Sequence, residues 1–389
     1  MEKPKILSTE PYLLYQNFID DIFGKDEVKI KPAESNPIIG TFKYIDDFQE
    51  FKKNFKNRLL QLKSCFELSS QYKELKNQVA LIADEKNWEG AYAELAVYDI
   101  LSKAGLPIEL NKTLPVDESY AKELGHQEAN EDGYIPHLNL YFDVKILSDV
   151  IGTVLKKIIS DAIKDSNPEY PCSVLPEYPL DDNEEKYINS HRKEIYNELR
   201  DFLKNHNSLK NGHKVFQSKV VEHLSYNIQW GGGINSSISC YNPYKHAFED
   251  RNIIFKRYTK KFLKNNPFIL VMVNFPWYNG KINNFADCDQ LYYRSLSRRT
   301  FCEYLKDTKL MKDIISNFNG SDTVFEVSRH LTGIIFIDDN IIKENSYLCS
   351  AYLNPNAINK NSRITDFIQM IVNGGDKRSL SDDFEYDNY

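Results

Sequence analysis

The sequence predicts an α/β (α+β) fold in which helices flank a mixed central sheet. Apolar residues recur at helical spacing over residues 46–85 and 88–104. Apolar runs rich in β-branched or aromatic residues, at 140–147, 268–273, 331–337 and 347–353, are typical of strands. Because strands and helices are interspersed along the chain and no internal repeat is present, we expect helices packed over one sheet.

Composition limits the class of protein. The 389 residues suffice for one large elaborated domain or two ordinary ones, and 41% hydrophobic content supports a sizeable core. The net charge of −7 argues against a chain coated in positive charge but permits a local basic groove. The six cysteines form no Cys-x-x-Cys pair. No signal-peptide or membrane-spanning pattern is found, so we expect a cytoplasmic protein without membrane association.

The first half of the chain divides into an extension and the start of a core. Residues 1–45 contain several prolines and are expected to be irregular, and residues 1–85 together form a helical N-terminal extension. The helix Trp88–Ala104 ends at Gly105 and opens the first half of the core, residues 86–165. A polar stretch, the strand Leu140–Leu147 and another helix complete this half.

The second half begins with an expected insertion. Residues 166–222 are rich in proline, contain an acidic loop, and are expected to form a helical insertion, serving as a lid or a specificity element. Residues 223–374 supply the second half of the core, including a helix over Tyr244–Leu263 and further strands. Residues 375–389 are expected to be a mobile acidic tail.

The strand at Leu140–Leu147 carries an acid and a lysine two positions apart. Side chains alternate between the faces of a strand, so Asp143 and Lys145 point to one side while Phe142 and Val144 point to the other. Charged side chains are rarely buried unless they are paired or bound to a metal. Two of them on one face of an apolar strand therefore indicate either a functional site or a plain ion pair.

Two further acids lie upstream of this strand. Asp132 precedes a glycine suited to a turn, and a short hairpin over Tyr134–Tyr141 would place it beside Asp143. Glu94, on the helix Trp88–Ala104, has small or apolar neighbours at helical spacing and therefore faces the packed side. The alternatives are Glu89 in place of Glu94, Asp117 or Glu118 in place of Asp132, and purely structural roles for these acids as cap, turn or ion-pair residues.

This order, an acid on a helix, a second acid, and then acid-x-Lys, resembles the PD-(D/E)xK nuclease superfamily, which has the restriction-endonuclease-like fold. Glu94 matches the helix acid, Asp132 the first aspartate, Asp143 the second acid and Lys145 the lysine, all within residues 88–165. No proline precedes Asp132, and the helix after Lys145 lacks the glutamine found in one subgroup. That subgroup is therefore disfavoured.

The resemblance implies a Mg²⁺-dependent endonuclease acting on DNA, of the restriction or anti-phage defence type, with Mn²⁺ as an alternative metal. Glu94, Asp132 and Asp143 would bind the metal, and Lys145 would orient or deprotonate the attacking water. Cutting both strands with one site per chain favours a homodimer, and a defence-system partner or activator fits the same class. The alternatives are a catalytically silent fold that binds nucleic acid or serves in assembly, and a nuclease acting on RNA.

Two basic clusters are candidate contacts for nucleic acid. One lies on the expected helix Tyr244–Leu263, and the other lies within residues 292–299, where two tyrosines precede the arginines. Basic side chains on one face can neutralise phosphates, and neighbouring aromatic rings can stack on bases. A solvated helix face is the alternative for the first cluster. The candidate residues are Lys256, Arg257, Lys260, Arg294, Arg298 and Arg299.

Overall fold

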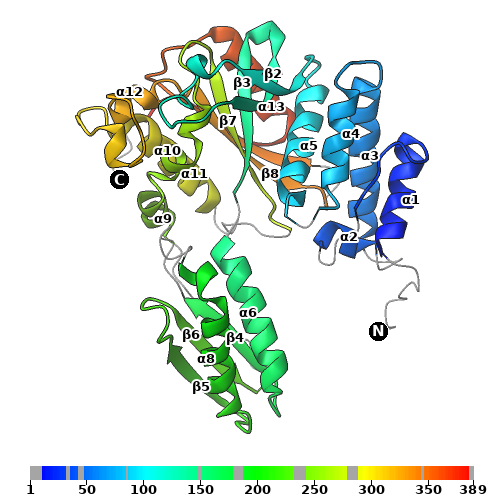
Figure 1. The fold of residues 1–389 in the computed structure, drawn as a ribbon, viewed down its shortest axis with the longest axis vertical. Helices are drawn as coiled ribbons and strands as arrows, with labels where there is room; N and C mark the ends of the chain where they lie inside the picture. The colour runs from blue at the N-terminus through cyan, green and yellow to red at the C-terminus, as the bar shows by residue number, and fades with distance from the viewer. Residues whose placement is uncertain are drawn as a thin grey trace. The chain divides into compact units, whose positions relative to one another are not determined.

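The computed structural model describes residues 11–31, 36–42, 48–84, 86–147, 150–177, 187–231, 242–277, 288–342 and 346–384 (Figure 1). The chain separates into two compact units. The larger unit combines Met1–Leu147 with Arg251–Tyr389, and the smaller unit is Ser148–Asp250. Among the described residues, no helix has the length and apolar character needed to cross a membrane.

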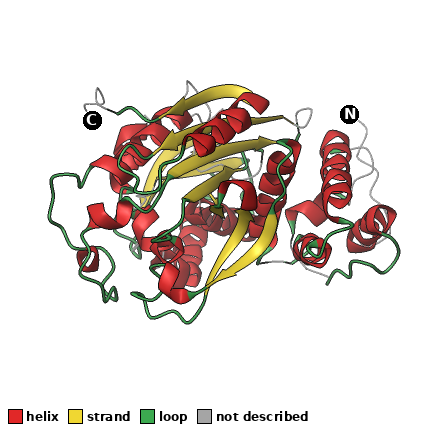
Figure 2. Ribbon diagram, turned by 90° about the horizontal axis from the view of Figure 1, so that it is seen from above, coloured by secondary structure: helices red, strands yellow, loops and turns green. Residues whose placement is uncertain are grey.

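The larger unit is built on a mixed sheet flanked by helices, which confirms the predicted α/β class (Figure 2). In the described part of the chain this sheet has seven strands in the order β1-β2-β3-β7-β8-β9-β10. The meander β1–β2–β3 is antiparallel, β3, β7 and β8 are mutually parallel, β9 is antiparallel to β8, and β10 is parallel to β9. The strand bounds are β1 Glu109–Leu114, β2 Ala129–Ile135, β3 Leu140–Ile146, β7 Phe268–Asn274, β8 Gly333–Asn340, β9 Ser346–Leu353 and β10 Asp376–Ser381.

The last strand differs from the expectation of a mobile tail over residues 375–389. β10 pairs with β9 from Asp376 to Ser381, so this part of the segment extends the sheet. Its short polar sequence gave no strand pattern, because an edge strand needs only one partner and little apolar surface. Residues 385–389 lie outside the described residues.

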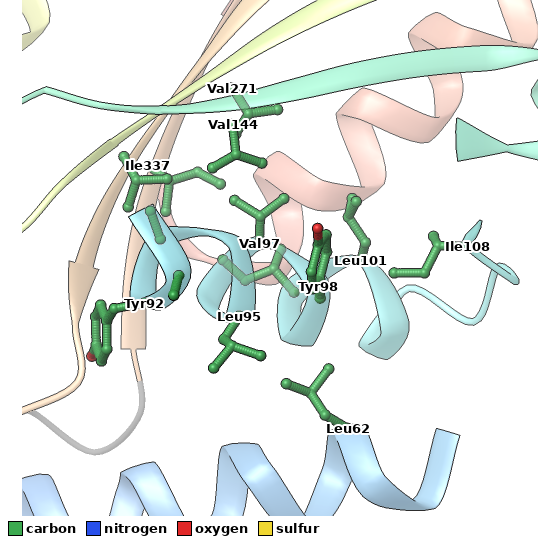
Figure 3. Close-up of a cluster of buried hydrophobic side chains, with 14 of the residues drawn as sticks. Leu62, Tyr92, Leu95, Val97, Tyr98, Leu101, Ile108, Val144, Val271 and Ile337 are labelled. Carbon is green, nitrogen blue, oxygen red and sulfur yellow. The ribbon is translucent and has the colours of Figure 1, made fainter. Parts of the chain in front are cut away.

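The helix α5 (Trp88–Lys103) is packed between the sheet and the N-terminal helices. Figure 3 shows Val144, Val271 and Ile337 approaching it from three neighbouring strands, with Leu62 of α3 (Gln49–Phe66) on its other side. All four side chains belong to one buried hydrophobic cluster. Because α5 is covered on both sides, it is apolar almost all round, as a buried helix must be.

The N-terminal residues are more regular than predicted. Residues 11–23 form α1 (Pro11–Phe23), which buries Tyr15 and Ile19, and residues 37–41 form α2 (Pro37–Thr41). Two of the prolines that indicated irregular structure, Pro11 and Pro37, stand at the first positions of these helices, where a missing N–H costs nothing. The other two, Pro4 and Pro32, lie outside the described residues. With α3 and α4 (Tyr72–Leu81), they make the expected helical extension, and Figure 1 shows α1, α3, α4 and α5 side by side.

Helices cover both faces of the central sheet. α13 (Ser362–Gly374) buries Ile364 and Ile368 in the same cluster as α5. On the opposite face, Tyr293 of α11 (Cys288–Cys302) stacks on Phe336 of β8 at a centroid distance of 4.2 Å. The expected helix over Tyr244–Leu263 is divided into α9 (Pro243–Glu249), α10 (Ile253–Tyr258) and the 3₁₀ turn η3 (Thr259–Lys261). The remaining short elements are η1 (Val116–Glu118), η2 (Pro136–Leu138), η5 (Met311–Asp313) and α12 (Val324–Ser328).

The smaller unit contains the segment expected to be a helical insertion. Its described residues form α6 (Val150–Ser166), α8 (Arg192–Lys204), α9 and a three-stranded antiparallel sheet in the order β4-β6-β5. The bounds of its strands are β4 Cys172–Glu177, β5 Gly212–Gln217 and β6 Ser225–Trp230. The unit extends beyond 166–222 because Leu155 of α6 and Trp230 of β6 share its own hydrophobic core. Two of the strands were missed because β5 is mostly exposed and β4 contains Pro176, which an edge strand tolerates.

A buried ion-pair network joins the N-terminal extension to the sheet. The Arg58 guanidinium of α3 donates to Asp339 of β8 at 2.7 Å, and its Nε lies 3.6 Å from Asp99 of α5. Asp99 also pairs with Lys103 at 2.7 Å, and Tyr92 donates to Asp339 at 2.9 Å. The two carboxylates are therefore matched by two cations, which is the condition for burying them without a large penalty.

Arg58→Ala is expected to destabilise the larger unit by about 3–5 kcal/mol, because it leaves two buried carboxylates facing one cation. Urea unfolding followed by circular dichroism measures the change. Lys53→Ala removes an exposed lysine from the same helix and should change stability by less than about 1 kcal/mol. Equal stability of the two variants would show that the network does not hold the extension.

Candidate active site

The acids singled out in the sequence meet where β2 parts from β3. The two strands pair from Ile135–Leu140 to Gly133–Phe142. Beyond the Gly133–Phe142 pair, the backbone N–H of Val144 in β3 donates to the side-chain Oδ2 of Asp132 in β2 at 2.7 Å. A side-chain carboxylate thus accepts the hydrogen bond that a strand backbone would otherwise take, and the strands form a fork around it.

The hairpin predicted over Tyr134–Tyr141 is present, but Gly133 has a different role from the one expected. It lies within β2 rather than in a turn, and a Cβ added there would stand 2.1 Å from Cζ of Phe142. The connection itself is made by η2 and by Asn139, whose φ of 48° is left-handed. Glycine is required at 133 because the Phe142 ring lies directly against the backbone at the fork.

Asp143 is the centre of the cluster and is completely buried. Its Oδ2 lies 2.6 Å from Nζ of Lys145, and its Oδ1 lies 2.9 Å from Nζ of Lys261. Lys145 also reaches Oδ2 of Asp132 at 3.5 Å. Burial alone would raise the pKa of Asp143, but the two lysines hold it below its ordinary value. Asp143 therefore stays ionised in a site from which water is largely excluded.

Glu94 of α5 reaches the same fork. The Tyr98 hydroxyl lies 3.0 Å from Oε2 of Glu94 and 2.8 Å from the backbone carbonyl of Asp132, so it links the helix acid to β2. Burial, and then the charge of Asp132, raises the pKa of Glu94 to about 8. The alternative acid Glu89 has a pKa raised by burial alone, without influence from these carboxylates. Of the two glutamates, Glu94 is the one placed at the cluster.

The alternatives to Asp132 lie elsewhere. Asp117 and Glu118 belong to η1, and Asp117 is an exposed residue that pairs with Lys122. Asp132 is instead largely enclosed, and burial followed by the charge of Asp143 raises its pKa to about 7. As expected, Asp132 lies close to Asp143: the Lys145 ammonium reaches both carboxylates, at 3.5 and 2.6 Å.

Two members of the cluster were missed by sequence analysis. Glu131 is 1% exposed, and neither of its carboxylate oxygens has a hydrogen-bond partner among the described residues. Burial, and then the charge of Asp143, raises its pKa well above the ordinary value. No signal in the sequence distinguished Glu131 from a solvent-facing neighbour of Asp132.

Lys261 is the second missed member. The sequence predicted one continuous helix over Tyr244–Leu263, whereas Lys261 lies in the 3₁₀ turn η3, where α-helical spacing does not apply. The chain after η3 is fixed by two backbone hydrogen bonds, Tyr120 N to Phe262 O at 3.1 Å and Lys264 N to Glu118 O at 2.8 Å. This anchoring turns the Lys261 ammonium towards Asp143 rather than towards solvent.

The cluster carries more negative than positive charge. Four carboxyl groups, those of Glu94, Glu131, Asp132 and Asp143, surround the two ammonium groups of Lys145 and Lys261, which leaves two negative charges when all are ionised. The raised pKa values of three of the acids follow from burial and from this crowding. At low pH, protons offset the surplus; near neutral pH, a divalent cation would do so.

The donor set fits a hard cation. Mg²⁺ and Mn²⁺ prefer carboxylate oxygens, and Glu94, Asp132 and Asp143 supply them from three different elements. Within the described ranges, no three His, Cys, Asp or Glu side chains already stand together as a metal centre. In this arrangement lysine ammonium groups supply the positive charge beside Asp143, and a cation would share these carboxylates with them.

The basic residues proposed from sequence occupy two different environments. Lys256, Arg257 and Lys260 are exposed on α10 and η3. Arg294 instead donates to Oγ of Ser381 and to the carbonyl of Asp383, and so holds the C-terminal segment. The other two arginines, Arg298 and Arg299, are partly buried on α11, and Arg299 pairs with Glu303 at 2.9 Å.

Comparisons of the chain with models of known protein families, with curated proteins and with solved structures find no match.

We expect the metal-free protein to lose stability as pH rises from about 5 to 8.5. The pKa values of Asp132 and Glu94, about 7 and about 8, exceed the roughly 4 of unfolded aspartate and glutamate. At pH values between the unfolded pKa and the folded pKa, these two carboxyl groups bind more protons in the folded state than in the unfolded state. Raising the pH through this range therefore favours unfolding.

Thermal melts in EDTA across this pH range measure the effect. Asp132→Asn should flatten the dependence, and Mg²⁺ should restore stability to the parent chain above pH 7.5. The same pH dependence in Asp132→Asn and in the parent chain would contradict the assignment.

Proposed function

We propose that this chain is a metal-dependent phosphodiesterase of the PD-(D/E)xK type, acting as an endonuclease on DNA. The observation that carries the proposal is the convergence of Glu94, Asp132, Asp143 and Lys145 at the fork between β2 and β3. These residues come from α5 and two strands, and they are the ones that the resemblance requires in one metal site.

The chemistry of phosphodiester hydrolysis matches this set. A bound Mg²⁺ or Mn²⁺ would polarise the phosphate and lower the pKa of a bound water. The two lysines lower the pKa of Asp143, so its ionised carboxylate could ligate the cation. Asp132 and Glu94 become ligands as they lose their protons.

Lys145 is positioned to act on water and phosphate. Its ammonium lies between the carboxylates of Asp143 and Asp132, and these raise its pKa above the ordinary value against the effect of burial. It therefore remains charged, and it can orient the attacking water and offset the negative charge that develops on the phosphate.

The exposed residues Lys256, Arg257 and Lys260 support contact with a nucleic-acid backbone. Because one site per chain cuts one strand at a time, the proposal includes a homodimer that cuts both strands. It also includes a restriction or anti-phage defence setting and an activating partner. RNA is the alternative substrate.

Asp143→Asn and Lys145→Ala are each expected to lower Mg²⁺-dependent cleavage by at least about 100-fold, since each removes a group that acts on the reacting phosphate or water. Supercoiled plasmid and an RNA transcript are incubated in parallel with each protein, in Mg²⁺, Mn²⁺ or EDTA, and products are resolved on gels.

Asp117→Asn provides the matched control, because it breaks an exposed Asp–Lys pair outside the site and should leave cleavage unchanged. Circular dichroism verifies that each variant is folded. Full activity of Asp143→Asn would overturn the proposed function, and cleavage of the transcript alone would reassign the substrate to RNA.

A further inference from the structure

A pocket of about 210 Å³ opens beside the carboxylate cluster, between the start of β2 and η3. Its lining residues are His126, Glu128, Ala129, Asn130, Lys260 and Lys261. Asn130 directly precedes Glu131 and Asp132 in β2, so the pocket and the acids are neighbours along the same strand. Its volume exceeds what a single water molecule needs, so it can admit a chemical group.

Lys261 belongs to both the pocket and the cluster. Its Nζ lies 2.9 Å from Oδ1 of Asp143 and also donates to the backbone carbonyl of Asn130. The side chain is only 14% exposed, so its position is set by these contacts rather than by solvent. A ligand in the pocket would therefore lie next to the lysine that balances Asp143.

The lining of the pocket suits an anion that also accepts hydrogen bonds. Lys260 and Lys261 bring positive charge, and His126 and Asn130 add side chains that can donate. Glu128 is the single acid of the lining and is exposed. A phosphate group matches this combination, because ammonium groups bind it as point charges and amide or imidazole N–H groups complete its contacts.

We propose that this pocket binds a backbone phosphate of the nucleic-acid strand, next to the phosphate that is cleaved. The inference rests on the proposed function, because it takes the scissile phosphate to lie at Asp132 and Asp143. A strand whose scissile phosphate lies at Asp132 and Asp143 continues past the carboxylate cluster. The pocket shares Lys261 with the cluster and presents a basic surface to the next part of that strand. The pocket thus places the strand in register with the acids and does not take part in bond cleavage.

The proposal is tested by binding of a fluorescein-labelled oligonucleotide in EDTA, followed by fluorescence anisotropy at several salt concentrations. Lys260→Ala and His126→Ala are expected to weaken binding, Lys260→Ala by about tenfold, and Lys260→Ala should reduce the salt slope by about 1. In Mg²⁺, both variants should raise KM for cleavage while leaving kcat nearly unchanged, because they remove binding that is equal in ground and transition states. Lys53→Ala, which removes an exposed lysine from α3, is the control.

Each outcome decides a separate point. If the parent chain binds and cleaves while Lys260→Ala and His126→Ala both behave like Lys53→Ala, the phosphate pocket and the backbone contact by Lys260 are wrong, and the proposed metal-dependent cleavage stands. If the parent chain neither binds nor cleaves any nucleic acid, both proposals fail. Tighter binding of a free nucleoside monophosphate than of the oligonucleotide, lost in Lys260→Ala, would overturn the assignment to a strand and indicate a small phosphate ligand.

Discussion

The buried charge of Asp143 constrains the architecture of the site. A carboxylate with no exposed surface on a central strand is tolerated only when positive groups lie against it, and here two lysines do so at 2.6 and 2.9 Å. Lys145 comes from the same strand and Lys261 from η3, so the electrostatic requirement ties β3 to a segment distant in sequence. The fork between β2 and β3 follows from the same requirement, because Asp132 enters it to bind the Val144 N–H and to contact Lys145.

Much of this site is readable in the sequence because it depends on short-range periodicity. The period of two along a strand places Asp143 and Lys145 on one face and Phe142 and Val144 in the core, as the structure shows. The packed surroundings of Glu94 on α5 and the hairpin after Asp132 follow in the same way from neighbours a few positions apart. Each of these predictions required only the geometry of a single element or of two consecutive ones.

Other features depend on contacts between distant segments and were not predictable. Lys261 faces Asp143 because the chain around η3 is bound to the η1 loop, whereas the sequence pattern predicted one continuous helix over this segment. Arg58 looks like an ordinary surface residue of α3 until Asp339 and Asp99 are brought to it. Pro11 and Pro37 indicated loops, although each begins a helix, α1 or α2, whose following residues have a core to cover.

The cluster at the fork differs from the Arg58 network in its balance of charges. Asp99 and Asp339 are matched one to one by Arg58 and Lys103, as expected of a network whose role is to hold elements together. The cluster at the fork keeps four carboxyl groups against two lysines, and three of those groups have raised pKa values. This surplus lowers stability, since each unmatched carboxyl is unfavourable as it ionises. In the function that we propose, a bound divalent cation would balance the surplus, because its charge would replace that of the protons.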